Sequence, residues 1–459
     1  MKYIRAILAA VVFLTLHAVT VRAETVEELK LMIDELRSDY ESKISALEAK
    51  IDELSADHNQ QVSQQVEAKL ATMKEEIKQD IKDDSFHVEY LGRDHDQFGK
   101  GGLVAQSPSG FDKVNVGGYM DHEFIEQEGR DSFFDQHRWI INIGAQIGER
   151  LSFFSEYEIE HGGPDASGGG EAKVEQAWVD YLIEDWVNFR AGALLVPFGR
   201  YNLYHDSDLQ DLTDRPLVVR DVIPSTWTES GAGFHGEVNP ALGSYEDLLI
   251  TYETYVINGL DDGFSDTGLS GAKGSLRSDN NNSKAVVGRV MLSPWLGQEL
   301  GVSGYWGKYN DFGDRIIGKA VDWHSVWGPL ELVGEYGIFD VDVPDFATTG
   351  ILDVADHYEG YYVQVNYHFW PEFLNDTFVG RSFDDPTFTL VGRYGAIEIN
   401  DDADAGTGDN EEERYTLGLN YRPVESWVFK MEYQWNDTEN EALERGDRES
   451  ILMSIAMGF

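Results

Sequence analysis

The chain has 459 residues and a formal net charge of −47, because it contains 83 Asp and Glu but only 36 Lys and Arg. This excess of negative charge nearly excludes nucleic acid as a partner, since binding to phosphate backbones requires basic side chains. The absence of cysteine removes thiol chemistry and thiolate metal sites. With 12% aromatic residues, the chain also differs from disordered acidic proteins, which are poor in aromatics.

Residues 1–23 have the features of a secretory signal peptide. Lys2 and Arg5 supply a positive start, residues 7–16 form a short apolar run, and Ala23 ends a stretch that fits a cleavage site. No stretch reaches the roughly 18 to 20 consecutive apolar residues that a membrane helix requires. We therefore expect the chain to be exported, and any membrane domain to be a β-barrel.

Residues 24–85 lack Gly and Pro and are rich in Glu, Lys, Ala and Leu. Apolar residues at alternating spacings of three and four over 26–40, continued after a stutter over 44–54, predict an α-helical coiled coil that associates with copies of itself. Over 62–81 the spacing is mostly four, which predicts local unwinding of the supercoil. His58 lies in this seam, and we interpret it as a tolerated polar interruption rather than a metal ligand.

From Val88 onward Gly becomes frequent, aromatic residues recur and helical periodicity disappears. We expect a linker over 86–111 and a β-barrel over 112–459. Segments with alternate apolar residues predict sixteen antiparallel strands, an even number as closure of the barrel requires. These segments are Lys113–Glu126, Gln136–Gly148, Arg150–Glu160, Ala172–Leu182, Trp186–Leu195, Gly231–Val238, Asp247–Asn258, Lys284–Ser293, Gln298–Tyr309, Arg315–Val326, Leu330–Val341, His357–Phe369, Thr387–Ile397, Arg414–Arg422, Trp427–Asn436 and Glu449–Phe459.

The connections between these segments alternate between short turns and long acidic stretches, as expected for a barrel with short periplasmic turns and long outer loops. The long stretches are 196–230, 259–283, 342–356, 398–413 and 437–448. The connection from Trp370 to Pro386 is longer than this pattern requires, so fourteen or eighteen strands stay open as alternatives.

Several predicted strands have one apolar and one charged face. In Arg150–Glu160, Leu151 and Phe153 lie on one side, whereas Ser152 and Glu156 lie on the other. A charged face cannot form a dry core, because unpaired buried charges cost several kcal/mol each. The pattern therefore predicts a transmembrane barrel with a water-filled lumen, and aromatics at strand ends would form its two interfacial girdles.

Charged residues of both signs recur on the predicted inner face. They would form opposing walls that orient a charged solute, or they would pair with one another and rigidify the wall, and the sequence leaves both readings open. The residues predicted to line the pore are Arg138, Arg190, Arg289, Arg393, Arg414, Glu156 and Asp180.

The longest connection follows the fifth predicted strand and lies within Leu194 to Val238. We expect residues 200–228 to fold back into the lumen as a constriction, with leucines against the wall and charged residues facing the channel. A surface lid or a latch between subunits is the alternative. The predicted constriction residues are Arg200, Asp206, Asp208, Asp211, Asp214, Arg215 and Arg220.

The C-terminal residues 451–459 alternate between large apolar and mostly small residues and end on Phe459. A single apolar face at the end of the chain is typical of a closing barrel strand, and the terminal Phe resembles the signal that the barrel-assembly machinery recognises. The last strand of a soluble sandwich is the alternative.

Three short motifs resemble the phosphate-selective porin superfamily over roughly residues 110–459: the corner Pro197-Phe198-Gly199, YVINGL at 255–260, and NNNSKAVVGRVMLSP at 280–294. The resemblance implies a homotrimer of sixteen-stranded barrels, and some relatives with an N-terminal coiled coil take up small organic anions. The barrel here has few Lys and very acidic loops, unlike phosphate-selective members. This difference argues against phosphate selectivity, because a negative entrance repels anions, whereas the inner arginines leave passage of an organic anion open.

The favoured function is therefore an outer-membrane porin for passive diffusion of ions and small polar solutes, in contact with lipid and lipopolysaccharide. The alternative is a structural anchor whose periplasmic coiled coil binds peptidoglycan or another partner. We expect no enzyme, cofactor or metal site, since the sequence has no Gly-x-Ser-x-Gly motif, no His pair at metal spacing and no Ser/His/Asp set. Divalent cations at the acidic loop 401–413 would bridge to lipopolysaccharide, but a solvated loop is the favoured reading.

Overall fold

The computed structural model describes the chain in two compact units that divide between Ser85 and Phe86. The described residues are 31, 38–39, 41–46, 69, 72–74, 87–93, 98–108, 110, 112–162, 170–240, 248–265, 267–343, 355–400, 410–438 and 448–459. Those of the first unit are helical, and Lys43 Nζ contacts Asp39 Oδ2 at 2.6 Å, one helical turn away. The signal segment and most of the predicted coiled coil lie outside the described residues. No helix in the described ranges is long and apolar enough to cross a membrane.

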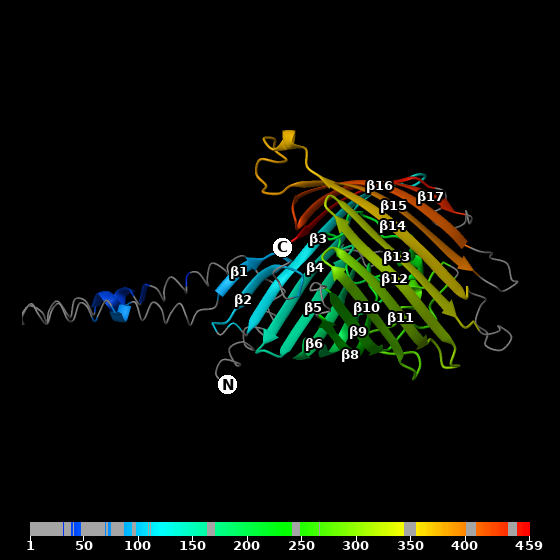
Figure 1. The fold of residues 1–459 in the computed structure, drawn as a ribbon, viewed down its shortest axis with the longest axis horizontal. Coiled ribbons are helices and arrows are strands. Elements are labelled where there is room, and N and C mark those ends of the chain that lie inside the picture. Colours follow the sequence, from blue (N-terminus) through cyan, green and yellow to red (C-terminus); the bar gives the residue numbers. More distant parts are fainter. Residues whose placement is uncertain are drawn as a thin grey trace, which may run out of the picture. The chain divides into compact units, whose positions relative to one another are not determined.

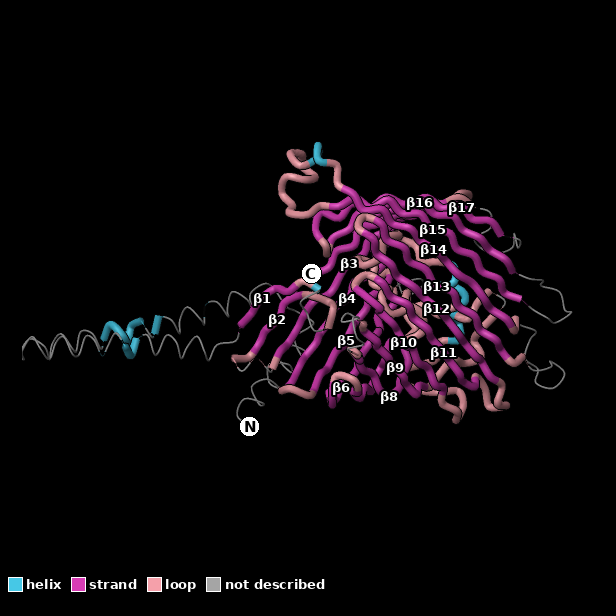
Figure 2. Tube along the Cα trace, viewed as in Figure 1, coloured by secondary structure: helices cyan, strands magenta, loops and turns pink. Residues whose placement is uncertain are grey.

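The second unit is built from a closed antiparallel sheet, whose strands dominate Figures 1 and 2. Consecutive strands from β3 to β18 pair with one another, and β18 pairs with β3, which closes the ring. These strands are β3 (Lys113–Gln127), β4 (Phe133–Ile147), β5 (Leu151–Glu160), β6 (Glu171–Glu184), β7 (Val187–Leu195), β8 (Thr228–Val238), β9 (Leu249–Ile257), β10 (Ala285–Trp295), β11 (Gln298–Lys308), β12 (Arg315–Trp327), β13 (Leu330–Val341), β14 (His357–Phe369), β15 (Thr387–Asn400), β16 (Asn410–Val424), β17 (Trp427–Thr438) and β18 (Ser450–Gly458).

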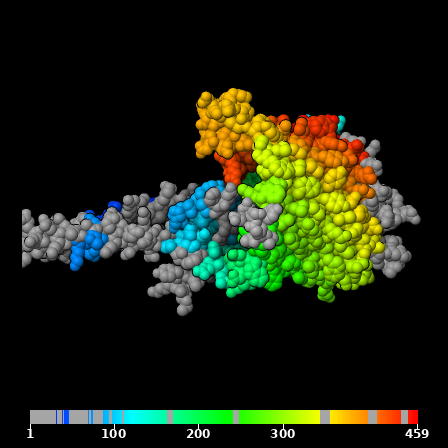
Figure 3. All heavy atoms as spheres, viewed as in Figure 1, coloured from blue at the N-terminus to red at the C-terminus, as the bar shows by residue number. Residues whose placement is uncertain are grey.

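The prediction of sixteen barrel strands is confirmed, with shifts of a few residues at the strand ends. The long connection from Trp370 to Pro386 contains a short 3-10 helix, Glu372–Leu374, and projects from one end of the sheet. It therefore adds no strand to the barrel. In the space-filling view, strands β10 to β17 follow one another as a continuous wall from green to red (Figure 3).

Side chains alternate between the two faces of the wall as predicted. In β17, Trp427, Phe429 and Met431 are exposed on the outer face. Lys430 and Glu432, at the alternate positions, are buried on the inner face. An apolar exterior around a charged interior is the arrangement that a barrel in a lipid bilayer requires.

A hairpin that the sequence did not predict lies in the expected linker 86–111. Its strands are β1 (His87–Leu91) and β2 (Gly102–Gln106), and β2 pairs with β3 at residues 113–116. β18 pairs with the remainder of the same β3 edge, from Tyr119 to Gln127. The two partners thus divide one edge of β3 between them.

The C-terminal residue lies where the β3 edge is divided. Phe459 N donates to Gly118 O at 2.9 Å, and Gly118 N donates to Phe459 O at 3.1 Å. A Cβ atom on the neighbouring Gly117 would lie 2.6 Å from Gly101 O, so only glycine allows the hairpin to approach this closely. The predicted assembly role of Phe459 stays a prediction, but its backbone completes the closing strand pair.

Candidate functional site: the interior of the barrel

The segment 196–227 between β7 and β8 leaves the wall at a fixed corner. Gly199 has φ +72°, a conformation that favours glycine, and a side chain there would collide with the carboxylate of Glu335. The backbone N–H groups of Arg200 and Tyr201 donate to Glu335 Oε2 at 3.1 and 2.9 Å. Gly199 N donates to Ser303 Oγ at 3.1 Å. The inner faces of β11 and β13 therefore determine where the segment turns inward.

Apolar residues of this segment pack against the inner wall. The rings of Phe198 and Phe339 lie 4.8 Å apart, and those of Trp227 and Tyr305 lie 5.2 Å apart. Leu217 is buried as well, close to a π-helical turn at Val218–Val222. Burial of large apolar side chains holds this part of the segment in place.

Polar residues of the segment contact the next strands along the wall, from β14 to β17. Asp211 accepts hydrogen bonds from Asn366 Nδ2 of β14 at 2.7 Å and from Asn420 Nδ2 of β16 at 3.1 Å. Thr213 N donates to Glu432 Oε2 of β17 at 2.6 Å. Asp214 pairs with Arg414 of β16. Segment 196–227 thus connects strands on different sides of the interior.

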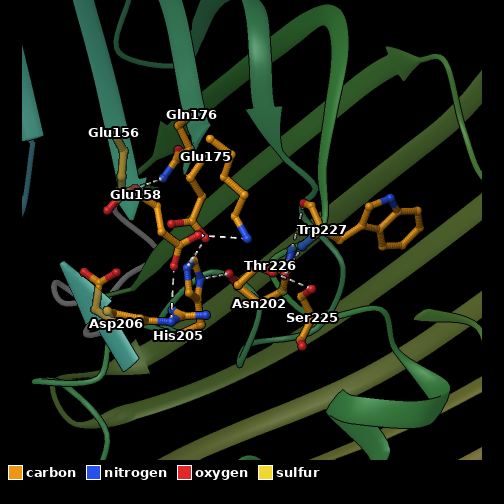
Figure 4. A network of polar contacts seen from close by, with 12 residues as sticks. Glu156, Glu158, Glu175, Gln176, Asn202, His205, Asp206, Ser225, Thr226 and Trp227 are labelled. Carbon is orange, nitrogen blue, oxygen red and sulfur yellow. Dashed lines mark hydrogen bonds and ion pairs between the residues drawn. The ribbon is translucent and has the colours of Figure 1, made fainter. Parts of the chain in front are cut away.

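A network of polar contacts surrounds the start of the segment near β5 and β6, and within it Asn202 joins the two ends of the segment (Figure 4). Asn202 Nδ2 donates to Val196 O at 2.8 Å, and Asn202 Oδ1 accepts from Trp227 N at 2.9 Å. His205 Nε2 lies 2.7 Å from Glu175 Oε1 of β6, and both side chains are almost fully buried. Burial works to lower the pKa of His205, but Glu175 outweighs it and the pKa is raised, which favours the charged imidazolium.

The residues that follow β1 also reach this segment, which the sequence did not predict. Arg93 pairs with Asp208 and with Asp206, the latter at 3.1 Å from Nη1 to Oδ2. Lys100 Nζ lies 2.8 Å from Asp206 Oδ2 and 3.3 Å from Glu156 Oε1 of β5. Burial works to raise the pKa of Asp206, yet Lys100 and Arg93 hold it well below its usual range. We call Arg93, Phe98 and Lys100 the N-terminal clamp.

Phe98 is the apolar member of the N-terminal clamp. Its ring lies 5.6 Å from that of Phe154 and 6.3 Å from that of Trp178. A Cβ atom on Gly144 would strike the ring of Phe98, so a glycine at this inner position makes room for it. The only signal in the sequence was two basic residues and an aromatic residue in a short stretch before a strongly acidic barrel.

The predicted pore-lining arginines lie on the inner face, and most of them pair with carboxylates. Arg190 donates to both oxygens of Asp180, at 2.7 and 2.8 Å. Arg289 Nη2 donates to Asp322 Oδ1 at 2.6 Å. The remaining pairs are Arg138 Nε with Glu158 Oε1 at 3.2 Å, Arg414 with Asp214, and Arg393 Nη2 with the backbone oxygen of Asp214 at 2.8 Å. These contacts favour the reading in which arginines and acids rigidify the wall.

The other predicted constriction residues are likewise engaged. Arg200 pairs with Glu299, and Arg215 donates to Ser225 Oγ. Arg220 lies within 3.8 Å of Asp214, Asp221 and Glu412. The structure therefore gives these predicted loop residues partners either on the wall or within the segment itself.

Cavities remain between the segment and the wall. A cavity of about 670 Å³ has Arg215, Arg220 and Arg414 among its lining residues, together with Glu123 and His137 of β3 and β4. Basic and acidic groups thus line the same space. Two smaller cavities, of about 280 and 190 Å³, are lined by other parts of the segment; Lys100 borders the first and Arg200 the second.

The chain is similar to several known proteins. The family described as phosphate-selective porin O and P matches residues 116–323 and 320–459. An uncharacterized protein of Aquifex aeolicus is 26% identical over 358 residues, which is 72% of this chain and 77% of that protein. Among solved structures, Salmonella typhi OmpF in complex with daunomycin is similar with a TM-score of 0.52 and 14% identity, over 76% of this chain and 98% of that one. The anion-selective porin of Comamonas acidovorans gives a TM-score of 0.49 and 12% identity, over 76% and 100% of the two chains.

Proposed function

Because the chain belongs to the phosphate-selective porin O and P family, we propose that it is an outer-membrane porin through which ions and small polar solutes diffuse passively. In this proposal segment 196–227 narrows the lumen of the barrel. The observation that supports this most strongly is the closed strand ring with an apolar exterior and a charged interior. The family and the fold support a channel rather than an enzyme.

The narrowing is supported by contacts on both sides of the segment. Its corner is fixed by Glu335 on β13, and its far part is bound to β14 and β17 through Asp211 and Thr213. A segment held at several points across the interior restricts the cross-section that a solute can use.

We further propose that the channel prefers cations. Most pore-lining arginines are neutralised by nearby carboxylates, as in the pairs Arg190 with Asp180 and Arg289 with Asp322. The chain as a whole carries a formal charge of −47. A negative entrance concentrates cations and repels anions, so phosphate is a poor candidate for the solute.

The assembly and placement of the chain are parts of the same proposal. Residues 1–23 would direct export, and residues 24–85 would form a coiled coil in the periplasm. Family resemblance favours a homotrimer in contact with lipid and lipopolysaccharide. Chemical cross-linking of the purified protein should then give a band at three times the mass of one chain, and a band pattern that stops at one chain would refute the trimer.

Swelling of liposomes tests diffusion of solutes. Vesicles that contain the refolded protein should swell in isotonic arabinose or glycine, at a rate that falls steeply with solute size. Vesicles with heat-denatured protein are the control. Equal swelling rates in the two preparations would overturn the proposed function.

A further inference from the structure

The inner wall where β3, β4 and β5 meet brings together side chains that bind metal ions. We propose that Asp121, Glu123 and His137 bind a divalent transition-metal cation such as Zn²⁺ inside the barrel. The oxygen atoms of the two carboxylates and a ring nitrogen of His137 all lie within 4.8 Å of one another. A metal site is a property that neither the fold nor passive diffusion requires.

A β-bulge places His137 in this position. Along β4 the inner face contains Arg138, so strict alternation would turn His137 outward. The pairing of β3 with β4 shifts between Asp121, which lies opposite Arg138, and Glu123, which lies opposite Asp135. The extra residue in β4 turns His137 toward the two carboxylates, as bulges near functional sites do.

The contacts at His137 leave one carboxylate oxygen without a proton to accept. His137 Nδ1 lies 3.2 Å from Asp121 Oδ2 and 2.7 Å from Glu123 Oε1. A ring nitrogen carries at most one hydrogen, and its hydrogen bond goes to Asp121. Within the described part of the chain, Glu123 Oε1 accepts no hydrogen bond, although Glu123 is only 6% exposed. A cation in place of the proton would bind all three groups.

Further side chains that can bind a metal ion lie beside this cluster. The rings of His137 and His161 are 5.5 Å apart, and His161 Nδ1 lies 2.7 Å from Asp135 Oδ2. Glu160 Oε1 lies 3.9 Å from His137 Nε2. His137, His161, Glu123 and Asp135 all line the cavity of about 670 Å³, so a hydrated cation can reach the site from the lumen.

The mixture of ligands favours a transition metal over Mg²⁺ or Ca²⁺, which bind oxygen atoms almost exclusively. Bond lengths of about 2.0 to 2.2 Å place neighbouring ligands of a tetrahedral Zn²⁺ roughly 3.4 Å apart. The observed 3.2 and 2.7 Å require only small rotations of Asp121 and Glu123. The two carboxylates would neutralise the charge of the cation, and water from the cavity would complete its coordination.

Zinc analysis of the purified full-length protein tests the site. The protein is treated with EDTA, incubated with ZnCl₂ and then passed through a gel-filtration column. Glu123→Gln and His137→Gln should each retain one Zn²⁺ per chain fewer than the unmodified protein. Their affinity for Zn²⁺ should be reduced roughly tenfold or more. His122→Gln is the matched control, because His122 lies between the two acids on β3 but stacks on Phe134, on the other face. It should retain the full amount.

Binding is measured without transport, so its outcome does not depend on the proposed function. Heat-dependent migration on a detergent gel identifies folded variants, and two independent variants guard against one that fails to fold. Equal zinc content in folded Glu123→Gln or His137→Gln and in the unmodified protein would overturn the proposal. Displacement of the bound Zn²⁺ by an equal concentration of MgCl₂ would overturn the preference for a transition metal.

Discussion

At the scale of single residues, the interior is organised by buried pairs of opposite charge. Arg289 of β10 is 8% exposed and Asp322 of β12 is fully buried, and they meet across the intervening strand. The sequence predicted that Arg289 faces inward, because alternation along a strand is visible in one segment. It could not predict the partner, because that depends on the stagger between strands that are distant in sequence.

Loss of one member of this pair should strongly destabilise the barrel. Arg289→Leu would leave Asp322 charged and buried, which costs about 3 to 5 kcal/mol in the free energy of unfolding. The double variant with Asp322→Leu should recover much of this loss. Arg315→Leu is the control, because Arg315 and its partner Asp342 are both well exposed. Urea titration of the protein in detergent micelles measures the difference, and equal stability of the single and double variants would contradict the argument.

Asp221 in segment 196–227 should make stability depend on pH. Burial raises the pKa of Asp221 to about 6, although Arg220 works to lower it. Above pH 6 the carboxyl is charged in both the folded and the unfolded chain, so burial reduces stability. As the pH falls from about 6 to about 4, it takes up a proton only in the folded chain, and this penalty is relieved.

The variant Asp221→Asn should therefore be more stable than the unmodified protein at pH 7, by on the order of 2 kcal/mol, and the difference should shrink toward pH 4. Thermal unfolding followed by circular dichroism at several pH values provides the comparison. A difference that stays constant from pH 7 to pH 4 would refute the role of Asp221.

At the scale of elements, the N-terminal clamp and segment 196–227 contact each other directly, through Arg93 and Lys100 of the clamp and Asp206 of the segment. The length and composition of the segment predicted an inward fold, because leucines alternate with charged residues. The clamp was missed because β1 and β2 have five residues each, too few to show a period-two pattern. Its partners, Asp206 and Glu156, are far away in the sequence.

Release of the corner at Gly199 should widen the channel. Glu335→Ala removes the carboxylate that accepts the N–H groups of Arg200 and Tyr201, so we expect a larger single-channel conductance and more current noise. Glu237→Ala, at an exposed position of β8, should conduct like the unmodified protein. Unchanged conductance in Glu335→Ala would show that the segment does not limit the flow of ions.

Loss of the N-terminal clamp should have a separate effect. The double variant of Arg93→Ala and Lys100→Ala removes two cationic partners of Asp206, so that only His205 would still counteract the effect of burial, which raises the pKa of Asp206. We expect an open-channel current whose noise increases as the pH is lowered toward 5. Noise recordings of the double variant and of Lys43→Ala, in the first unit, provide the contrast. If the noise of the double variant equals that of Lys43→Ala at every pH, the result would contradict a role of the clamp in holding the segment.

At the scale of the whole molecule, the fold was predictable because each strand carries its own pattern. Apolar residues on alternate positions, short turns and a final apolar strand are local features, and together they gave the sixteen strands from β3 to β18. The division of the β3 edge between β2 and β18 was not predictable, since it depends on glycines that permit a close approach. Alternation along a strand predicted the inward orientation of single residues such as Arg289, but it could not predict which charged groups pair.

The charge balance of the whole molecule sets the central expectation, a conducting channel that favours cations. The most direct test is single-channel recording in a planar bilayer with a tenfold gradient of KCl. We predict discrete conductance steps and a reversal potential of the sign that K⁺ selectivity gives. Absence of conductance, or a reversal potential of the sign that Cl⁻ selectivity gives, would contradict the account.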